Sequence, residues 1–405
     1  MALTGTPFFI LTIVLFVGSI ALAMVQWLTR GNGAGGNAGI GTRAAGRRKR
    51  SGGGTGPVRT VGFFATILFS QATAIALVFV MVNNDNQLYG SWGDLLGTSN
   101  HVRSVPVPPK DNGLAGDQAA AAASPGASAP AKVVAKFKEP DSDAVPRDVK
   151  QTDLNGKLSG VEGEVLVWTP PQYDDPAYKD KTFPVVELLV GYPGSSSAWY
   201  GKSGMNVTNQ LAPLMKSGQV TPFILVSPRF NLLPNNQDSG CADIPGKVNA
   251  ETWLTRDVPQ MVLDNFRAQD TASGWAVAGY SAGGHCATRL VIGHPDRYRA
   301  AISMSGYNSP QNEADSLVGK DPQLNQADNP LNMLTRATTP PNIGLWLSGG
   351  QGADGYPDAQ ALKQAAKAPT TATVTETAGG HLTSVWSQQV VPAFKWLSGI
   401  IPAPK

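Results

Sequence analysis

Ser281 lies in the stretch of this 405-residue sequence that carries the clearest chemistry. The residues Gly279-Tyr280-Ser281-Ala282-Gly283 fit the pattern G-x-S-x-G, with the apolar run "WAVAGY" ending in the pattern and a helix-like stretch after it. A serine at such a strand-to-helix turn has its hydroxyl lifted above the sheet, and the turn needs small neighbours on both sides. We therefore predict that Ser281 is a nucleophile and that the backbone N–H of Ala282 helps to bind the oxyanion.

A serine hydroxyl needs an adjacent base, and the chain has four histidines. His101 lies near the apolar N-terminal segments. His285 is one helical turn beyond Ser281, and His294 lies where that helix is expected to end. His381, in "TAGGHLTSVW", follows the last predicted strand on a Gly-Gly loop, where a serine hydrolase carries its base. We predict His381 as the base and a packing role for His285.

The acid that orients the histidine should lie between the serine and the histidine in the chain, on a loop after a strand. The stretch "IGLWLSGGQGADGYPDAQAL" offers Asp354 and Asp358. Asp354 is nearer the end of the predicted strand, whereas Asp358 resembles an N-terminal residue of the next helix. Glu376 is a third candidate, but it falls inside a strand. We favour Asp354 and leave Asp358 open.

The second donor of an oxyanion hole should come from the loop after the strand "VVELLVG". The backbone N–H of Tyr192, next to Gly191, is our candidate. No metal-ligand cluster and no dinucleotide-binding motif stand out in the sequence, so we expect no metal and no cofactor.

Short apolar strands and amphipathic helices alternate through the C-terminal part of the chain. Runs such as "FPVVELLVG", "TPFILVSP", "AAISMSG" and "IGLWLSGG" read as buried strands, and residues 252–266 and 282–292 read as helices. This alternation predicts an α/β fold in which a mostly parallel sheet has helices on both faces, with active residues at the carboxyl ends of the strands. With G-x-S-x-G, it predicts the α/β-hydrolase fold.

Two long apolar segments precede this domain. Residues 8–28 and 61–82 contain no charged side chain, and each is long enough to span a bilayer as a helix, which takes about 20 residues. Ser70, Gln71 and Thr73 in the second segment suggest a side that contacts another helix. We therefore predict a membrane hairpin in residues 1–82. A cleaved signal peptide is not expected, because the positive charges follow the first apolar run instead of preceding it.

The loop at 29–60 between these segments is strongly basic. The chain carries a net charge of +3, and seven arginines and lysines fall in this loop without any acid, so the rest carries −4. This distribution argues against a nucleic-acid partner. The positive-inside rule puts the loop in the cytoplasm and the catalytic domain outside it, as expected for a multi-pass protein of a bacterial cell membrane. The same loop could also bind anionic lipid headgroups.

Residues 83–146 form the predicted connection to the catalytic domain at 147–405. After a juxtamembrane stretch with Tyr89 and Trp92, the composition from 102 to 146 shifts to Ala, Pro, Ser, Gly and Lys. A chain of this kind has no core of its own and acts as a flexible linker, here with a root-mean-square span of roughly 35–40 Å. We expect the catalytic domain to stay near the membrane or within the cell wall.

Taken together, "VVELLVGYPG", "ETWLTRDVP", "AGYSAGG" and "GGHLTSVW" resemble, in that order, the "putative esterase" branch of the α/β-hydrolases, over roughly 160–398. This branch includes the esterase-D-like enzymes and the secreted mycolyltransferases. The resemblance assigns Ser281 as nucleophile, His381 as base, and the amides of Tyr192 and Ala282 as oxyanion donors. Asp354 rests on chain order alone.

Two positions differ from the mycolyltransferases. Val190 stands where those enzymes have an aspartate at a sugar-binding position, and Leu382 stands where they have an aromatic residue. The membrane hairpin is also absent from the secreted enzymes. We therefore do not expect mycolyl transfer to trehalose.

The chain has two cysteines, Cys241 and Cys286. Outside the cytoplasm a disulfide between them is plausible, and it would close a loop of about 45 residues, worth roughly 3–4 kcal/mol. Two free buried cysteines are the alternative.

These features predict a membrane-anchored serine esterase that acts outside the cytoplasm on a small-molecule, lipid or glycan ester. An acyltransferase acting on a cell-envelope lipid or glycan would share the same acyl-enzyme, so the sequence does not separate the two. An inactive envelope scaffold is a third hypothesis. The acyl chain, the alcohol and the oligomeric state are left open.

Overall fold

The computed structural model describes residues 3–4, 6–31, 57–86, 88–102, 132, 134–235, 237–350 and 354–405. The chain forms two compact units, Met1–Asp85 and Asn86–Lys405. Residues 32–56 of the predicted basic loop, and with them its cytoplasmic assignment, lie outside the described residues.

The first unit is a pair of helices, α1 (Thr6–Gly31) and α2 (Pro57–Asn86). Their segments Thr6–Thr29 and Thr60–Asn86 are long and apolar enough to cross a membrane. These bounds contain the predicted spans at 8–28 and 61–82 and extend them at both ends. The structure contains no bilayer, so the crossing itself stays a prediction.

Polar side chains lie between the two helices of this unit. The hydroxyls of Ser19 and Thr73 are 3.3 Å apart, and the Gln26 amide donates to the Thr66 hydroxyl at 3.1 Å. Thr73 therefore lies in the predicted contact side, whereas Gln71 is exposed. Hydrogen bonds of this kind stabilise helix pairs in an apolar environment.

An eight-stranded sheet organises the second unit, in the order β1-β2-β4-β3-β7-β8-β9-β10. Strands β4, β3, β7, β8, β9 and β10 run parallel to one another, whereas β2 pairs antiparallel with both β1 and β4. The strands are β1 (Lys150–Asn155), β2 (Glu162–Trp168), β3 (Val185–Leu189), β4 (Ile224–Pro228), β7 (Trp275–Tyr280), β8 (Ala300–Met304), β9 (Gly344–Gly350) and β10 (Thr371–Thr377), with the small hairpin β5 (Asp243–Ile244) and β6 (Val248–Asn249) apart from them.

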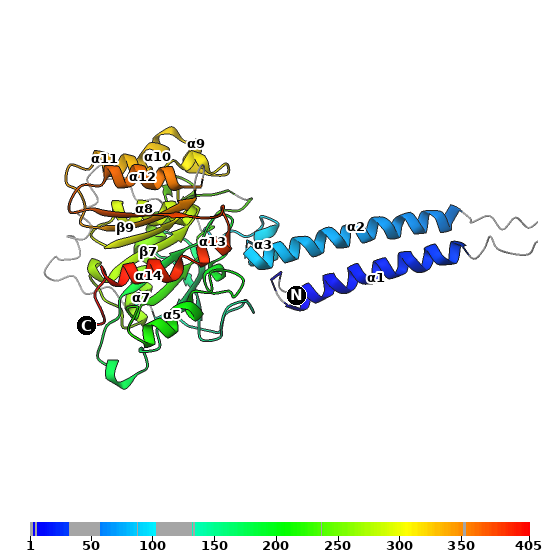
Figure 1. Cartoon of the computed structure of the whole chain (residues 1–405), viewed down its shortest axis with the longest axis horizontal. Helices are drawn as coiled ribbons and strands as arrows, with labels where there is room; N and C mark the ends of the chain where they lie inside the picture. Colours follow the sequence, from blue (N-terminus) through cyan, green and yellow to red (C-terminus); the bar gives the residue numbers. More distant parts are fainter. Residues whose placement is uncertain are drawn as a thin grey trace, which may run out of the picture. The chain divides into compact units, whose positions relative to one another are not determined.

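Helices cover both faces of the sheet. Figure 1 shows α11 and α12 on one side and α5 and α14 on the other. The helices of this unit are α3 (Trp92–Leu95), α5 (Val207–Lys216), α6 (Ala250–Thr252), α7 (Val258–Asn265), α8 (Ala282–Gly293), α9 (Leu317–Lys320), α10 (Pro322–Ala327), α11 (Pro330–Arg336), α12 (Tyr356–Ala365), α13 (Thr383–Ser387) and α14 (Val390–Ser398), with short 3-10 turns between some of them and a π-helical turn at Trp253–Asp257.

The central strands have apolar residues on both faces, which is why helices cover the sheet on both sides. Every residue of β3, β7 and β8 is buried, as their near-continuous apolar sequences require. The strand order and the helix after β7 confirm the predicted α/β-hydrolase fold. The helix expected over 252–266 is continuous only from Val258 to Asn265, because the turn before it is π-helical.

Residues before the predicted domain start at 147 also pack in the second unit. The boundary at 147 itself stays a prediction. Lys138 pairs with Gln151 of β1 through two backbone hydrogen bonds of 2.8 and 2.9 Å. Phe137 packs edge-on against Phe266, with ring centroids 5.1 Å apart. Residues 134–146 of the expected linker are thus part of the packed unit, because they extend the edge of the sheet.

Residues 88–102 of the expected linker also pack against the second unit. Val102 forms a bridge with Val161, and the backbone N–H of Glu162 donates to the carbonyl of His101 at 2.8 Å. Between these two packed stretches, residues 103–131 lie outside the described residues. The strand β1 and the helices at 317–336 had no clear signal in the sequence.

Glu187 is a buried acid in the central strand β3. Its carboxyl lies 3.0 Å from the hydroxyl of Tyr298, and that hydroxyl also lies 3.1 Å from the carbonyl of Leu254. Burial raises the pKa of Glu187 to about 8. A protonated Glu187 can donate from Oε2 to Tyr298 while Tyr298 donates to the carbonyl of Leu254, whereas Oε1 of Glu187 has no hydrogen-bond partner among the described residues.

We predict that Glu187→Gln makes the stability of the protein less dependent on pH. The folded state holds a proton on Glu187 up to about pH 8, whereas an unfolded glutamate releases it near its ordinary pKa of 4.5. The free energy of unfolding should therefore fall between these values by at most about 1.4 kcal/mol per pH unit. Denaturant unfolding at pH 5, 6, 7 and 8 measures this. The free energy of unfolding of the variant minus that of the wild type should increase with pH. A difference that is the same at every pH would contradict a raised pKa of Glu187.

Candidate active site

Ser281 occupies a strained turn between β7 and α8. Its φ of 55° and ψ of −125° lie outside the regions that side chains other than glycine normally adopt. Close packing on both sides holds it there. A Cβ on Gly279 would collide with the backbone of Gly283, and a Cβ on Gly283 would collide with the carbonyl of Leu189 in β3. The two glycines of the motif are therefore needed for backbone contact among β3, β7 and α8.

The structure brings the three predicted triad residues together. The Nε2 atom of His381 lies 2.9 Å from the hydroxyl of Ser281. Its Nδ1 atom lies 2.6 Å from a carboxylate oxygen of Asp354. Each residue follows a strand of the parallel region, namely β7, β9 and β10, so all three lie at the carboxyl edge of the sheet.

Asp354 is held by further hydrogen bonds. Its second carboxylate oxygen accepts from the hydroxyl of Ser305 at 3.2 Å and from the backbone N–H of Gly350 at 3.3 Å. The indole of Trp386 donates to Ser305 at 2.9 Å and packs edge-on against the ring of His381, with centroids 4.7 Å apart. These contacts fix both the acid and the imidazole that it orients.

The other two acids lie elsewhere. Asp358 accepts from the backbone N–H of Asn308 at 3.1 Å and so holds the loop after β8. Glu376 is exposed on β10. Of the three predicted candidates, Asp354 is the one in hydrogen-bond contact with His381.

The remaining histidines have other partners. The ring of His285 is buried, stacks on Tyr307 with centroids 4.8 Å apart, and donates from Nδ1 to the Tyr307 carbonyl at 2.8 Å. Burial lowers the pKa of His285 to about 4. His294 lies 2.5 Å from a carboxylate oxygen of Glu251 at the end of α8.

The loop after β3 lies against the nucleophile. A Cβ on Gly191 would lie 3.1 Å from the Cβ of Ser281, so the backbone of Gly191 packs against the Ser281 side chain. The next residue is Tyr192, and Ala282 is the first residue of α8. Ala282 therefore directly follows the nucleophile in the chain, and Tyr192 directly follows the glycine that packs against Ser281. Their assignment as oxyanion donors remains our proposal.

A pocket of about 490 Å³ opens beside the triad. Polar residues dominate its wall, and it has no arginine or lysine among the described residues that line it. Besides the triad it is lined by Ser305, Tyr307, Asn312, Glu313, Gly355, Pro357 and Asp358. Burial raises the pKa of Glu313 and of Asp358, and the nearby Asp315 raises that of Glu313 further. The pocket is therefore polar and acidic.

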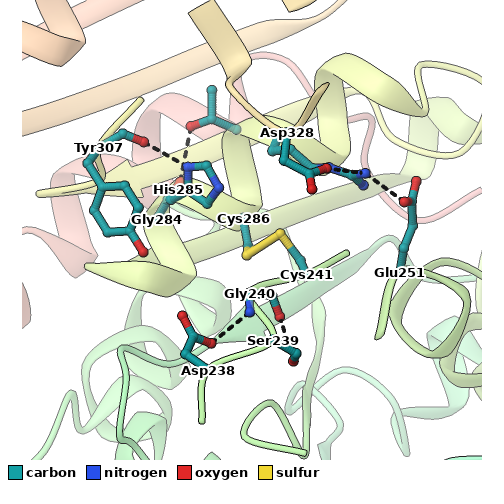
Figure 2. The surroundings of a disulfide bond; sticks show 12 residues. Asp238, Ser239, Gly240, Cys241, Glu251, Gly284, His285, Cys286, Tyr307 and Asp328 are labelled. Atoms are coloured by element: carbon teal, nitrogen blue, oxygen red, sulfur yellow. Dashed lines mark hydrogen bonds and ion pairs between the residues drawn. A yellow bond between two sulfur atoms is a disulfide. The ribbon is translucent and has the colours of Figure 1, made fainter. Parts of the chain in front are cut away.

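Cys241 and Cys286 are joined in a disulfide, and their α-carbons are 5.7 Å apart. Figure 2 shows the bond linking α8 to the loop that carries Asp238, Ser239 and Gly240. The ligand atoms of Cys241, Cys286 and His285 lie within 4.8 Å of one another, but the sulfurs are bonded to each other and are not free to ligate a metal.

Asp238 is the buried acid of this loop. One of its carboxylate oxygens accepts from the backbone N–H of Gly240 at 2.7 Å (Figure 2). Burial raises the pKa of Asp238 to about 7. Burial and the charge of Asp238 both raise the pKa of Tyr192, so this loop acts electrostatically on the neighbouring candidate oxyanion loop.

Several residues around the triad had not been expected. Ser305, Trp386 and Glu313 come from three separate segments of the chain. The signal that could have found Ser305 is its position directly after β8, at the same edge of the sheet as Ser281. Trp386 stands in the motif "GGHLTSVW", but nothing in the motif itself indicates contact with the base.

Comparisons with known proteins bear on the family and the fold. The profile of the protein family described as "Putative esterase" matches residues 160–397. An uncharacterized protein of Corynebacterium glutamicum is 25% identical over 248 residues, which cover 58% of this chain and 57% of that protein. The chain thus spans just over half the length of this relative.

Two solved structures share the fold. A ferulic acid esterase is 21% identical and covers 62% of this chain and 98% of its own, with a TM-score of 0.52. An S-formylglutathione hydrolase from Agrobacterium tumefaciens is 15% identical and covers 65% of this chain and 100% of its own, with a TM-score of 0.51. At these identities the likeness concerns the fold.

We predict that Asp354→Asn lowers kcat for an activated ester by roughly 10⁴-fold, because an asparagine favours the wrong histidine tautomer. Glu376→Gln, a change on the exposed face of β10, should leave kcat within about twofold of the wild type. Steady-state kinetics of the two variants and of Asp358→Asn measure this. A larger loss in Asp358→Asn than in Asp354→Asn would assign the acid to Asp358.

Proposed function

Because this chain belongs to the "Putative esterase" family, we propose that it is a membrane-anchored serine esterase whose acyl-enzyme forms on Ser281. The family match and the fold make it a serine hydrolase or a related acyltransferase. The observation that carries the choice of residues is the unbroken hydrogen-bonded series from Asp354 through His381 to Ser281.

The mechanism follows from the atoms in contact. His381 Nε2 takes the proton of the Ser281 hydroxyl as its oxygen attacks the ester carbonyl, while Asp354 holds the proton on Nδ1 and stabilises the imidazolium. The amides of Ala282 and Tyr192 bind the oxyanion. His381 then protonates the leaving alcohol. In the second half a water molecule gives a proton to His381 and attacks the acyl carbonyl; His381 then returns this proton to the Ser281 oxygen as the bond to the acyl carbon breaks and the acid leaves.

The pocket indicates the kind of substrate. A site with Glu313 and Asp358 in its wall and no basic side chain among its described lining residues disfavours anionic groups. Carboxylates accept hydrogen bonds from hydroxyl and ammonium groups. We propose that the portion of the ester next to these acids is a neutral polyol or a cationic group, and not a long apolar chain.

The disulfide and the two apolar helices support the proposed location. Disulfides persist outside the cytoplasm and are rare inside it. Helices α1 and α2 have the length and composition of membrane spans. We propose that both cross the membrane and that the catalytic unit lies on the extracytoplasmic side. An inactive scaffold is disfavoured, because it would have no need for an intact triad.

Reaction with a fluorophosphonate probe tests the enzymatic proposal. We expect the folded wild type to be labelled on one serine and Ser281→Ala to be unlabelled and to lose at least about 10³-fold in ester hydrolysis. Equal labelling of both proteins would contradict the nucleophile. Adding polyol acceptors to the reaction of a radiolabelled ester tells hydrolysis from transfer: a new acylated polyol in place of the free acid would assign an acyltransferase.

A reporter fused after Lys405 tests the topology. With two spans and the basic loop inside, a periplasmic-type alkaline phosphatase should be active at this position, and a fluorescent protein that folds only in the cytoplasm should stay dark. The reverse pattern would place the catalytic unit in the cytoplasm.

A further inference from the structure

Residues 88–102 contact the loop that carries the candidate oxyanion donor. A small cavity of about 40 Å³ is lined on one side by Leu88, Tyr89 and Gly90 and on the other by Tyr192 to Ser195. A Cβ on Gly90 would lie 3.1 Å from the hydroxyl of Ser195. The segment that directly follows α2 in the sequence is therefore in van der Waals contact with this loop.

A series of partly buried ionic contacts leads from this segment to the same loop. Asp94 in α3 forms an ion pair with Arg229, and the side chains of both are 13% exposed. Arg229 also pairs with Glu164 of β2 at 3.1 Å. Glu164 in turn accepts from the hydroxyl of Ser196 at 2.9 Å. Ser196 begins the 3-10 turn that closes the oxyanion loop.

Arg229 reaches the loop by a second route. Its Nε donates to the backbone carbonyl of Asn231 at 3.2 Å. The Asn231 side-chain amide donates to the carbonyl of Gly194, two residues after Tyr192. Arg229 is therefore connected to both ends of the segment Gly194–Ser196, through Asn231 at Gly194 and through Glu164 at Ser196.

The segment itself is fixed at several points. The hydroxyl of Ser91 caps α3 by accepting from the backbone N–H of Asp94 at 3.1 Å. Gly97, with a φ of 66°, lies against the backbone of Asn235. The pairing of His101 with Glu162 ties the far end to the start of β2. Asp94 is therefore presented to Arg229 by a held backbone, not by a free chain end.

We propose that Asp94 is a positioning residue for the oxyanion loop, so that residues 88–102 are a working part of the active site. This inference rests on the proposed function. Asp94 and Glu164 both form ion pairs with Arg229. If Asp94 loses its charge, Arg229 keeps only Glu164 as a partner in a partly desolvated site. Glu164 would then shift, and with it the loop that it holds through Ser196. A displacement of about 1 Å at a reacting centre lowers a rate by about 100-fold.

The test is the kinetics of the full-length chain in detergent with a p-nitrophenyl acetate substrate. Rates are expressed per serine that reacts with a fluorophosphonate after long incubation. Asp94→Asn should lower kcat by about 10- to 100-fold, because it perturbs an oxyanion donor, while KM changes by less than about threefold. Asp94→Glu keeps the charge and should recover most of kcat.

A double-mutant cycle identifies the route. Ser196→Ala removes the last hydrogen bond of the series and should also lower kcat. If Asp94 acts through Arg229, Glu164 and Ser196, the double variant should be little worse than the slower single variant. If the two losses multiply instead, the route through Glu164 and Ser196 is wrong.

Asp148→Asn is the matched control. Asp148 accepts from the indole of Trp168 at 2.8 Å, at the end of β2 away from Glu164, so this change should leave kcat unaltered. A wild-type kcat in Asp94→Asn, or a loss equal to that of the control, would overturn the positioning role alone. Failure of the wild type to react with the fluorophosphonate would instead overturn the proposed function.

Discussion

The backbone of Ser281 is the constraint on which the site depends. A residue with a side chain at a φ of 55° is strained by about 1–3 kcal/mol, so the surrounding packing must hold it in place. The backbone N–H of Ser281 donates to the carbonyl of Met304 in β8 at 2.9 Å, and its carbonyl accepts from His285 at 3.0 Å. The turn is thus fixed from the neighbouring strand and from its own helix. The contact of Gly279 with Gly283 leaves no room for the turn to relax.

Helix α8 must also be fixed, because it begins directly after Ser281. A disulfide and a cluster of ion pairs hold it. The disulfide at Cys286 ties its first half to a loop. In its second half, Arg289 pairs with Glu251 at 2.6 Å and with Asp328 at 2.6 Å. Figure 2 draws the disulfide together with Glu251 and Asp328 of this ionic cluster. The buried Arg289 is costly to remove, since its loss would leave two carboxylates without their counter-charge.

This arrangement gives a physical meaning to the segment "ETWLTRDVP". Glu251 holds Arg289 of α8, the indole of Trp253 donates to the carbonyl of Arg229 at 2.9 Å, and Asp257 accepts from the backbone N–H of Ser159 at 2.8 Å. None of these side chains lies among the triad residues. The segment connects the nucleophile helix, the arginine beside the oxyanion loop and the start of β2, which is a scaffolding role.

The sequence could predict the parts of the site that depend on local pattern and chain order. Ser281 is marked by its glycines, and His381 and Asp354 follow strands whose carboxyl ends must meet at one edge of a parallel sheet. The preference for Asp354 over Asp358 came from distance to the strand end, and the contact with His381 agrees with it. Ser305, Trp386 and Glu313 could not be assigned, because each depends on how separate loops pack and none has a local pattern that marks it.

The predicted linker is another case in which composition did not reveal contacts with distant residues. Its Ala-, Pro- and Ser-rich composition suggested a spacer between the membrane helices and the enzyme. However, Val102 and Lys138, which flank the stretch 103–131, both pair with the edge of the same catalytic unit. Composition alone could not indicate these contacts, because they depend on strand pairing with residues that lie far along the chain.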